Sequence, residues 1–255
     1  MLESGPFRPG DRPAGSIMEQ NIRRITWCVM MPYPEYSYRN RKDAGRYLAL
    51  RLISFRESDV VVFAVLRGGV PVAVEVAREL DCDLDIIAPR KIPIPHHTEA
   101  GYGAVTEDGI IVLNEPLVRE LHLTEAQIRH HAQIVSAEIA RRKKIFQAVL
   151  EPSSVTGKKA IIVDDGIASG YTMVAAVRSL GRRGAQAVVA AAPVASGNGW
   201  EIVSREADQV VCPVVSSTYP FAVAGFYEEW HDLTDDEVMQ DLEKFKKNRR
   251  GKRHD

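Results

Sequence analysis

The sequence predicts an α/β fold with a Rossmann-like, mostly parallel sheet flanked by helices. Between residues 40 and 247, apolar runs suited to buried strands alternate with segments of helical periodicity. Two of these runs, 60–66 and 160–163, end in a glycine-containing loop that leads into a helix. Because ligands bind beyond the carboxyl ends of such strands in open parallel sheets, we expect the functional site at this edge.

Length and composition are those of a soluble globular protein. The chain has 255 residues, 45% hydrophobic and 26% charged, which suits one large or two small domains. The net charge of −1 creates no overall field toward nucleic acid or membrane, so neither is expected as a partner. Cys28, Cys82 and Cys212 show no paired spacing, which indicates a reducing cytoplasm rather than zinc or disulfides. The absence of a long apolar run or a secretion-signal pattern agrees with a cytoplasmic location.

Both ends of the chain are expected to lie outside the folded domain, which we place at residues 37–243. Residues 1–36 are rich in Pro, Gly and Arg without sustained periodicity, as in a poorly ordered tail. Residues 244–255 form a basic tail that we expect to fray. Alternative starts of the chain are Met18, Met30 and Met31.

The first half of the domain begins with a helix from residue 40, where apolar residues repeat every three to four positions. The run 60–66 reads as a buried strand that ends at Arg67-Gly68-Gly69, and a helix follows to Leu80. A short strand is expected at 84–89. Two prolines and two glycines then predict an irregular loop over residues 90–103.

The second half continues the alternation of helices and strands. Residues 104–106 and 109–113 fit a small antiparallel pair, followed by a short helix at 114–121. A capping-box pattern at Thr124 starts a long helix toward Leu150. The later elements are strands at 186–194 and 209–214, helices at 198–207 and 235–247, and an aromatic-rich stretch at 216–230.

The segment 160–172 is the strongest functional signal. An apolar strand ends in Asp164 and Asp165, a loop of small residues follows, and a helix begins near Thr172. The loop amides and the helix N-terminus favour an anion such as phosphate. The two carboxylates would repel it, so vicinal hydroxyls or a hydrated divalent cation are their natural partners. Phosphate beside a diol describes a ribose 5-phosphate, although an ordinary strand–helix turn is the structural alternative.

This segment resembles the phosphoribosyl-pyrophosphate loop of type I phosphoribosyltransferases. The family pattern is an apolar strand, two acidic residues, two small residues and a short Thr- or Ser-containing loop, and residues 164–172 fit it throughout. The resemblance extends over roughly residues 40–239. Within the family, the sequence is similar to a subgroup of predicted phosphoribosyltransferases whose substrate is unsettled. It implies the type I phosphoribosyltransferase fold, with a small hood at about residues 214–234.

The resemblance also implies a role for each part of the site. Asp164 and Asp165 would hold the ribose hydroxyls and, through water, the Mg²⁺ cofactor. Arg67, Arg90 and Lys91 complete the expected catalytic set by binding polyphosphate. The expected substrate-binding residues are Gly68, Gly69, Gly166, Ile167, Ala168, Ser169, Gly170, Tyr171, Thr172, Phe226 and Tyr227.

The lid and the hood leave alternatives open. The resemblance makes residues 90–103 a lid, with His97 and Glu99 as proton-transfer candidates, whereas an exposed loop pair is the plainer interpretation of His96 and His97. In the hood, aromatic rings either stack on the acceptor base or simply pack against the core. The aromatic candidates are Tyr219, Phe221, Phe226 and Tyr227.

The predicted function is transfer of ribose 5-phosphate from phosphoribosyl pyrophosphate to a nitrogen acceptor, a nucleobase or related heterocycle, with release of pyrophosphate. The resemblance implies a homodimer. The alternative function is a non-catalytic regulator that senses phosphoribosyl pyrophosphate or a nucleotide on the same fold, because fold alone does not fix function. The presence of both a lid and a pyrophosphate loop favours the enzyme.

Overall fold

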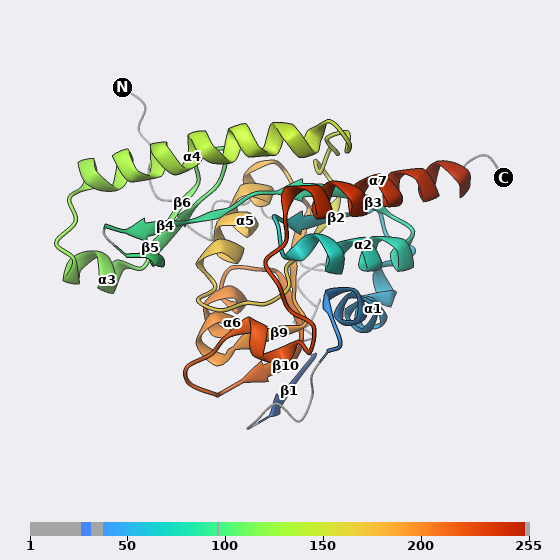
Figure 1. Cartoon of the computed structure of the whole chain (residues 1–255), viewed down its shortest axis with the longest axis horizontal. Coiled ribbons are helices and arrows are strands. Elements are labelled where there is room, and N and C mark those ends of the chain that lie inside the picture. Colours follow the sequence, from blue (N-terminus) through green and yellow to red (C-terminus); the bar gives the residue numbers. More distant parts are fainter. Residues whose placement is uncertain (1–26, 32–37, 96, 253–255) are drawn as a thin grey trace, which may run out of the picture.

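The structure, a computed structural model, describes residues 27–31, 38–95 and 97–252 (Figure 1). Its centre is a seven-stranded parallel sheet in the order β1-β10-β8-β7-β2-β3, with β9 paired to β10. The predicted parallel sheet is therefore confirmed. The strands are β1 (Trp27–Met31), β2 (Val60–Val65), β3 (Asp83–Ile87), β7 (Lys159–Val163), β8 (Ala187–Ala191), β9 (Val194–Ser196) and β10 (Gln209–Ser216).

Helices cover both faces of this sheet. One face packs against α1 (Arg41–Arg51), α2 (Gly69–Leu80) and α7 (Asp235–Lys252), and the other against α5 (Tyr171–Arg182) and α6 (Gly197–Ser204). Strand β2 shows why its sequence is continuously apolar. Alternate residues of this strand enter the two opposite clusters, so every side chain is buried.

A second, three-stranded antiparallel sheet extends to one side of the molecule, where Figure 1 shows it beside α3 and α4. It consists of β4 (Arg90–Ile94), β5 (His97–Val105) and β6 (Ile111–Leu113). Helices α3 (Glu115–Glu120) and α4 (Glu125–Gln147) share its apolar cluster, and α4 begins with the predicted capping box. The predicted antiparallel pair is confirmed.

Three local predictions are wrong. Residues 90–103 are not irregular, because β4 pairs with β5 and the register shifts around Pro93 accommodate the proline. Residues 1–36 are not a tail without regular structure throughout, since Trp27–Met31 form β1. The run 186–194 is not one strand, because β8 ends before Pro193 and β9 begins after it.

The C-terminal segment is also more ordered than predicted. Helix α7 continues to Lys252 instead of fraying from residue 244. Leu242 and Phe245 are buried in the same cluster as α2, and Lys246 donates a hydrogen bond to the Val149 carbonyl oxygen at 2.7 Å. Two short 3-10 turns, η2 (Ile53–Phe55) and η3 (Val223–Phe226), complete the described elements. None of the helices in the described ranges is long and apolar enough to cross a membrane.

The order of the strands determines where a ligand can bind. The chain leaves β2 toward β3 on one side, whereas β7 lies on the other side of β2 and leads to β8. The carboxyl ends of β2 and β7 therefore lie at the point where the direction of winding reverses, which is the usual ligand site of such sheets. Gly45 lets α1 pack closely against α2, because a Cβ atom there would lie 2.7 Å from the Val72 carbonyl oxygen in α2.

Candidate active site

The two glycine-containing loops predicted to bind ligand are in direct contact. One follows β2 at residues 67–69, beginning after a cis Leu66–Arg67 peptide bond, and the other follows β7 at residues 164–170. A Cβ atom on Gly68 would overlap the Asp165 carboxylate, at 2.6 Å from its Cγ. A Cβ atom on Gly69 would lie 3.0 Å from the Asp164 Cα. Glycine is thus required for the Arg67–Gly69 loop to lie against the acid pair.

The acid pair is partly buried and closely coupled. The side chain of Asp164 accepts a hydrogen bond from the Asp165 main-chain N–H at 2.9 Å. Burial, together with the neighbouring Asp165 charge, raises the pKa of Asp164 well above its usual value. Burial also raises the pKa of Asp165, although the Arg41 guanidinium opposes this rise. Two ionised carboxylates here are therefore costly unless a cation or hydroxyl donors accompany them.

Arg41 is the site residue that sequence reasoning missed. Its Nε donates to Asp165 Oδ2 at 2.8 Å, with only 8% of the Arg41 side chain and 13% of the Asp165 side chain exposed. Its Nη1 donates to the His231 carbonyl oxygen at 2.9 Å, and its guanidinium carbon lies 3.7 Å from the centroid of the Trp230 ring. Arg41 therefore joins the acid pair to the end of residues 214–234, the segment predicted to be the hood.

The predicted hood segment makes a second contact with the acid pair through Tyr227. The Tyr227 hydroxyl donates to the Asp165 carbonyl oxygen at 2.6 Å. The rings of Phe226 and Tyr227 are buried in an apolar cluster that also contains Tyr38, Ala44 of α1 and Val194 of β9. Of these two aromatic residues, only Tyr227 contacts the acid pair. The burial of both rings supports the interpretation that they pack against the core.

The loop after the acids is open to an anion. Ala168 and Ser169 are exposed, and α5 begins immediately after them at Tyr171. Gly170 takes a φ of 82°, a left-handed conformation that glycine adopts readily. Within the described part of the chain, the main-chain N–H groups of residues 168–171 have no protein acceptor. Free amides at a helix N-terminus suit an anion, so the predicted phosphate-binding role of this loop stays a prediction.

The predicted cations lie at different places. Arg67 reaches Asp235 at the start of α7, with 3.4 Å between Nη1 and Oδ1. Arg90, at the start of β4, forms an ion pair with Glu138 of α4, and Lys91 is exposed on the same strand. The structure therefore places Arg67 beside the acid-pair loop but gives Arg90 a partner on α4.

The predicted lid forms part of the second sheet. Tyr102 is fully buried there, and its hydroxyl lies 2.9 Å from His131 Nδ1 on α4. His97 and Glu99 fall within β5, but their side chains, like the whole of His96, lie outside the described residues. Their predicted role in proton transfer stays a prediction.

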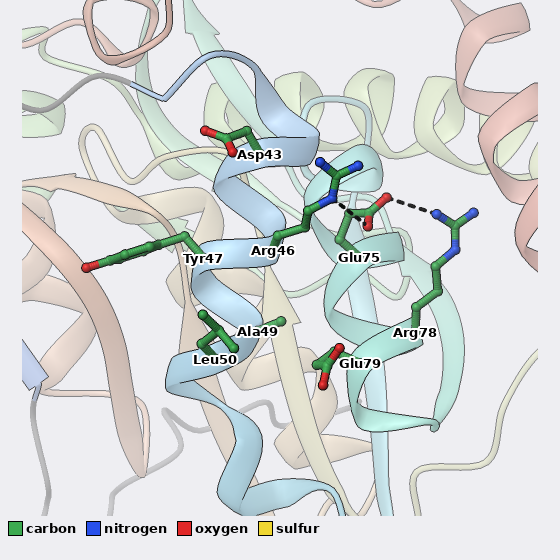
Figure 2. A pocket seen from close by; sticks show the side chains of 8 residues that line it. All are labelled: Asp43, Arg46, Tyr47, Ala49, Leu50, Glu75, Arg78 and Glu79. Carbon is green, nitrogen blue, oxygen red and sulfur yellow. Dashed lines mark hydrogen bonds and ion pairs between the residues drawn. The ribbon is translucent and has the colours of Figure 1, made fainter.

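A groove between α1 and α2 is separate from these loops. It is lined by Asp43, Arg46, Tyr47, Ala49, Leu50, Glu75, Arg78 and Glu79, none of which belongs to either loop. Figure 2 shows Arg46 and Arg78 both reaching Glu75, with nitrogen–oxygen distances of 3.4 Å and 2.9 Å. Because these charges compensate one another, the groove does not present a strongly charged surface to a ligand.

Comparison with known proteins identifies the class of the chain. The sequence model of the phosphoribosyl transferase domain matches residues 37–229. The chain therefore belongs to the phosphoribosyl transferase family, and the family predicted from the acid-pair motif is confirmed. It is 40% identical over 205 residues to a protein named "Putative phosphoribosyl transferase" in two strains of Mycobacterium tuberculosis, CDC 1551 and H37Rv.

The share of the matched protein that is covered differs between the sequence relatives and the structural one. The alignment covers 80% of this chain but 46% of the Mycobacterium tuberculosis proteins, so the chain spans about half the length of the curated relatives it matches. The fold is similar to the crystal structure of TT1426 from Thermus thermophilus, with a TM-score of 0.68 and 32% identity. That match covers 82% of this chain and 99% of the Thermus protein.

Proposed function

We propose that this chain transfers ribose 5-phosphate from phosphoribosyl pyrophosphate to a nitrogen acceptor and releases pyrophosphate. The observation that carries the proposal is the contact between the Arg67–Gly69 loop and the acid pair at the switch point of the sheet. One loop offers a cation and glycine amides, whereas the other offers two carboxylates followed by free amides. A sugar bearing a phosphate on one side and a pyrophosphate on the other matches this order of charges.

In this proposal the 5-phosphate binds the loop of residues 166–172. Ala168 and Ser169 are exposed there, and the amides of residues 168–171 have no protein acceptor within the described ranges. Gly166, Ile167, Tyr171 and Thr172 shape and flank this loop. A phosphate would supply the missing acceptors and would complement the positive end of the α5 dipole.

The acid pair would bind the ribose hydroxyls and a divalent cation. Hydroxyl donors suit Asp164 and Asp165 because burial disfavours their unaccompanied charges. The described residues contain no group of three acidic, His or Cys side chains that could enclose a metal ion. Two adjacent carboxylates suit Mg²⁺, which binds through few protein ligands plus water and substrate oxygens. Such an ion would neutralise charge on the pyrophosphate.

The chain's own contribution to the reaction would be positioning and charge stabilisation. The bond to pyrophosphate breaks through an oxocarbenium-like state, as in glycoside cleavage. Arg67 and the amides at Gly68 and Gly69 would stabilise the departing pyrophosphate. Arg90 and Lys91 stay proposed ligands of the polyphosphate, and Arg90 would have to exchange Glu138 for phosphate. Homodimer formation stays a prediction.

The test is a pyrophosphate-release assay with phosphoribosyl pyrophosphate, Mg²⁺ and a panel of nucleobases. The parent chain should release pyrophosphate with at least one base, and Asp164→Asn should abolish that release. Asp59→Asn, at an exposed carboxylate outside both loops, is the matched control and should retain it. Binding of phosphoribosyl pyrophosphate without release for any base would favour the sensing regulator, and absence of binding would overturn both functions.

A further inference from the structure

Two arginines from distant parts of the sequence converge on one carboxylate beside the proposed pyrophosphate loop. Arg67 Nη1 lies 3.4 Å from Asp235 Oδ1, and Arg142 Nε lies 3.7 Å from Asp235 Oδ2. The exposed fraction of the side chain is 35% for Arg67, 28% for Arg142 and 33% for Asp235, so a ligand can reach all three from solvent. Figure 1 shows the start of α7 near the C-terminal half of α4, which allows these residues to meet.

Asp235 satisfies the two guanidinium groups poorly. Both distances exceed those of strong charge-assisted hydrogen bonds, which are about 2.7–2.9 Å. Among the residues that the structure describes, neither guanidinium has another polar partner. Two positive charges therefore face one negative charge, and most of their N–H donors have no protein acceptor. A group with more negative charge and more oxygen atoms would fit this pair of arginines better than one carboxylate does.

The location of Asp235 is not explained by its helix alone. The first turn of α7 contains Asp235, Asp236 and Glu237, all of which are favourable near the positive end of a helix dipole. Asp236 is exposed, whereas Glu237 takes part in the cap with Thr234. Only Asp235 of these three is paired with the arginines. The contact therefore involves a specific carboxylate rather than general acidity of the turn.

We propose that Arg142 is a second cation of the pyrophosphate site and that Asp235 is a resident anion that the pyrophosphate group of the substrate displaces. The inference rests on the proposed function, because Arg67 is the cation of the pyrophosphate loop there. Arg142 follows Glu138 by one turn of α4, and Glu138 pairs with Arg90. One face of α4 thus runs past both Arg90 and Arg67. Each of these cations is paired with a carboxylate that a polyphosphate would replace.

The test measures binding of inorganic pyrophosphate and of phosphoribosyl pyrophosphate, each with Mg²⁺, by calorimetry. Asp235→Asn should tighten pyrophosphate binding about fivefold, because it removes one competing charge at close range. Asp236→Asn is the matched control, since it removes an equal charge from the same helix turn, and it should change affinity less than about twofold.

The second arm concerns Arg142. Arg142→Met should weaken pyrophosphate binding at least about fivefold, whereas Arg142→Lys, which keeps the charge, should retain most of the affinity. Arg141→Met, at an exposed neighbour on the same helix, should leave affinity unchanged. The opposite effects of Asp235→Asn and Arg142→Met cannot arise from a common loss of folding.

The outcomes separate this inference from the function on which it rests. If the parent binds phosphoribosyl pyrophosphate and each variant matches its control, the function stands and the inference is overturned. Weaker pyrophosphate binding by Asp235→Asn would also overturn it. If the parent binds neither ligand, both the inference and the proposed function fail.

Discussion

Replacing Arg41 by methionine should lower the free energy of unfolding by about 3–5 kcal/mol. Removing one partner of a buried ion pair leaves an uncompensated charge, and penalties of about this size are typical. The pair is buried, with 8% of the Arg41 side chain and 13% of the Asp165 side chain exposed, so solvent does little to screen it. The variant also loses the stacking on Trp230 and the hydrogen bond to the His231 carbonyl oxygen.

The assay is thermal and urea unfolding of the parent and variant. For a chain of this size, the expected loss corresponds to a fall in melting temperature of about 6–20 °C. Arg39→Met is the control because Arg39 pairs with Glu229 on the exposed surface, and its unfolding midpoint should not change measurably.

A double-mutant cycle tests the physical reason for this loss. Combining Arg41→Met with Asp165→Asn removes both charges, so the double variant should be at least about 1 kcal/mol more stable than the sum of the single effects predicts. A stability loss below about 1 kcal/mol for Arg41→Met, or an additive cycle, would refute the reasoning that this ion pair is a buried, coupled unit.

Three further predictions concern packing, protonation and thiol reactivity. Gly68→Ala should lower the free energy of unfolding by about 1–3 kcal/mol, because the new Cβ would overlap Asp165. Gly181→Ala, with open space at its Cβ, should not destabilise the chain. Urea unfolding measures both, and equal effects would contradict the predicted overlap. Hydrogen bonds of the α7 cap lower the pKa of Glu237 to about 2, so its ionised form contributes stability above its unfolded pKa, and this contribution is lost as pH falls toward 2. The melting temperature of Glu237→Gln should lie below that of the parent, and this difference should shrink between about pH 5 and pH 3. A difference that stays constant with pH would contradict this. Burial raises the pKa of Cys82 to about 12, so its thiol should resist alkylation by iodoacetamide at about pH 8 until urea unfolds the chain; rapid labelling of the native protein would contradict its burial.

Local sequence was sufficient to predict the two loops of the site. Each loop follows a continuous apolar run and contains glycines. Within each loop region, the apolar run and the glycines span only about a dozen residues. The capping box at Thr124 is equally local, because the side chains that form it are three residues apart. The family was recognisable from the same short segment, residues 164–172.

The contacts that complete the site could not be predicted because they join distant segments. Arg41 and Asp165 are separated by 124 residues, and Arg67 and Asp235 by 168. Nothing in the sequence around Arg41 distinguishes it from a solvated arginine at a helix start. Strand β1 was missed for a similar reason, because its pairing with β10 at the sheet edge leaves only a short apolar run as a local signal.

Prolines and charges also misled the sequence interpretation where tertiary contacts override local preference. Pro93 lies in β4 at an edge of the antiparallel sheet, where register shifts make room for it. The basic end of α7 remains helical because Phe245 is buried and Arg249 forms an ion pair with Asp83. The partners of α7 lie far away in the sequence, whereas Pro93 pairs with Gly101 of the adjacent strand β5, so the error there was in the local interpretation of the prolines and glycines.

The most direct test of the account is calorimetric titration of phosphoribosyl pyrophosphate with Mg²⁺ into the parent chain and into the variant that combines Asp164→Asn with Asp165→Asn. The account predicts that the parent binds and that the variant, confirmed as folded by circular dichroism, binds at least about tenfold more weakly. Equal affinities would contradict the assignment of the acid pair to the ribose hydroxyls and the divalent cation.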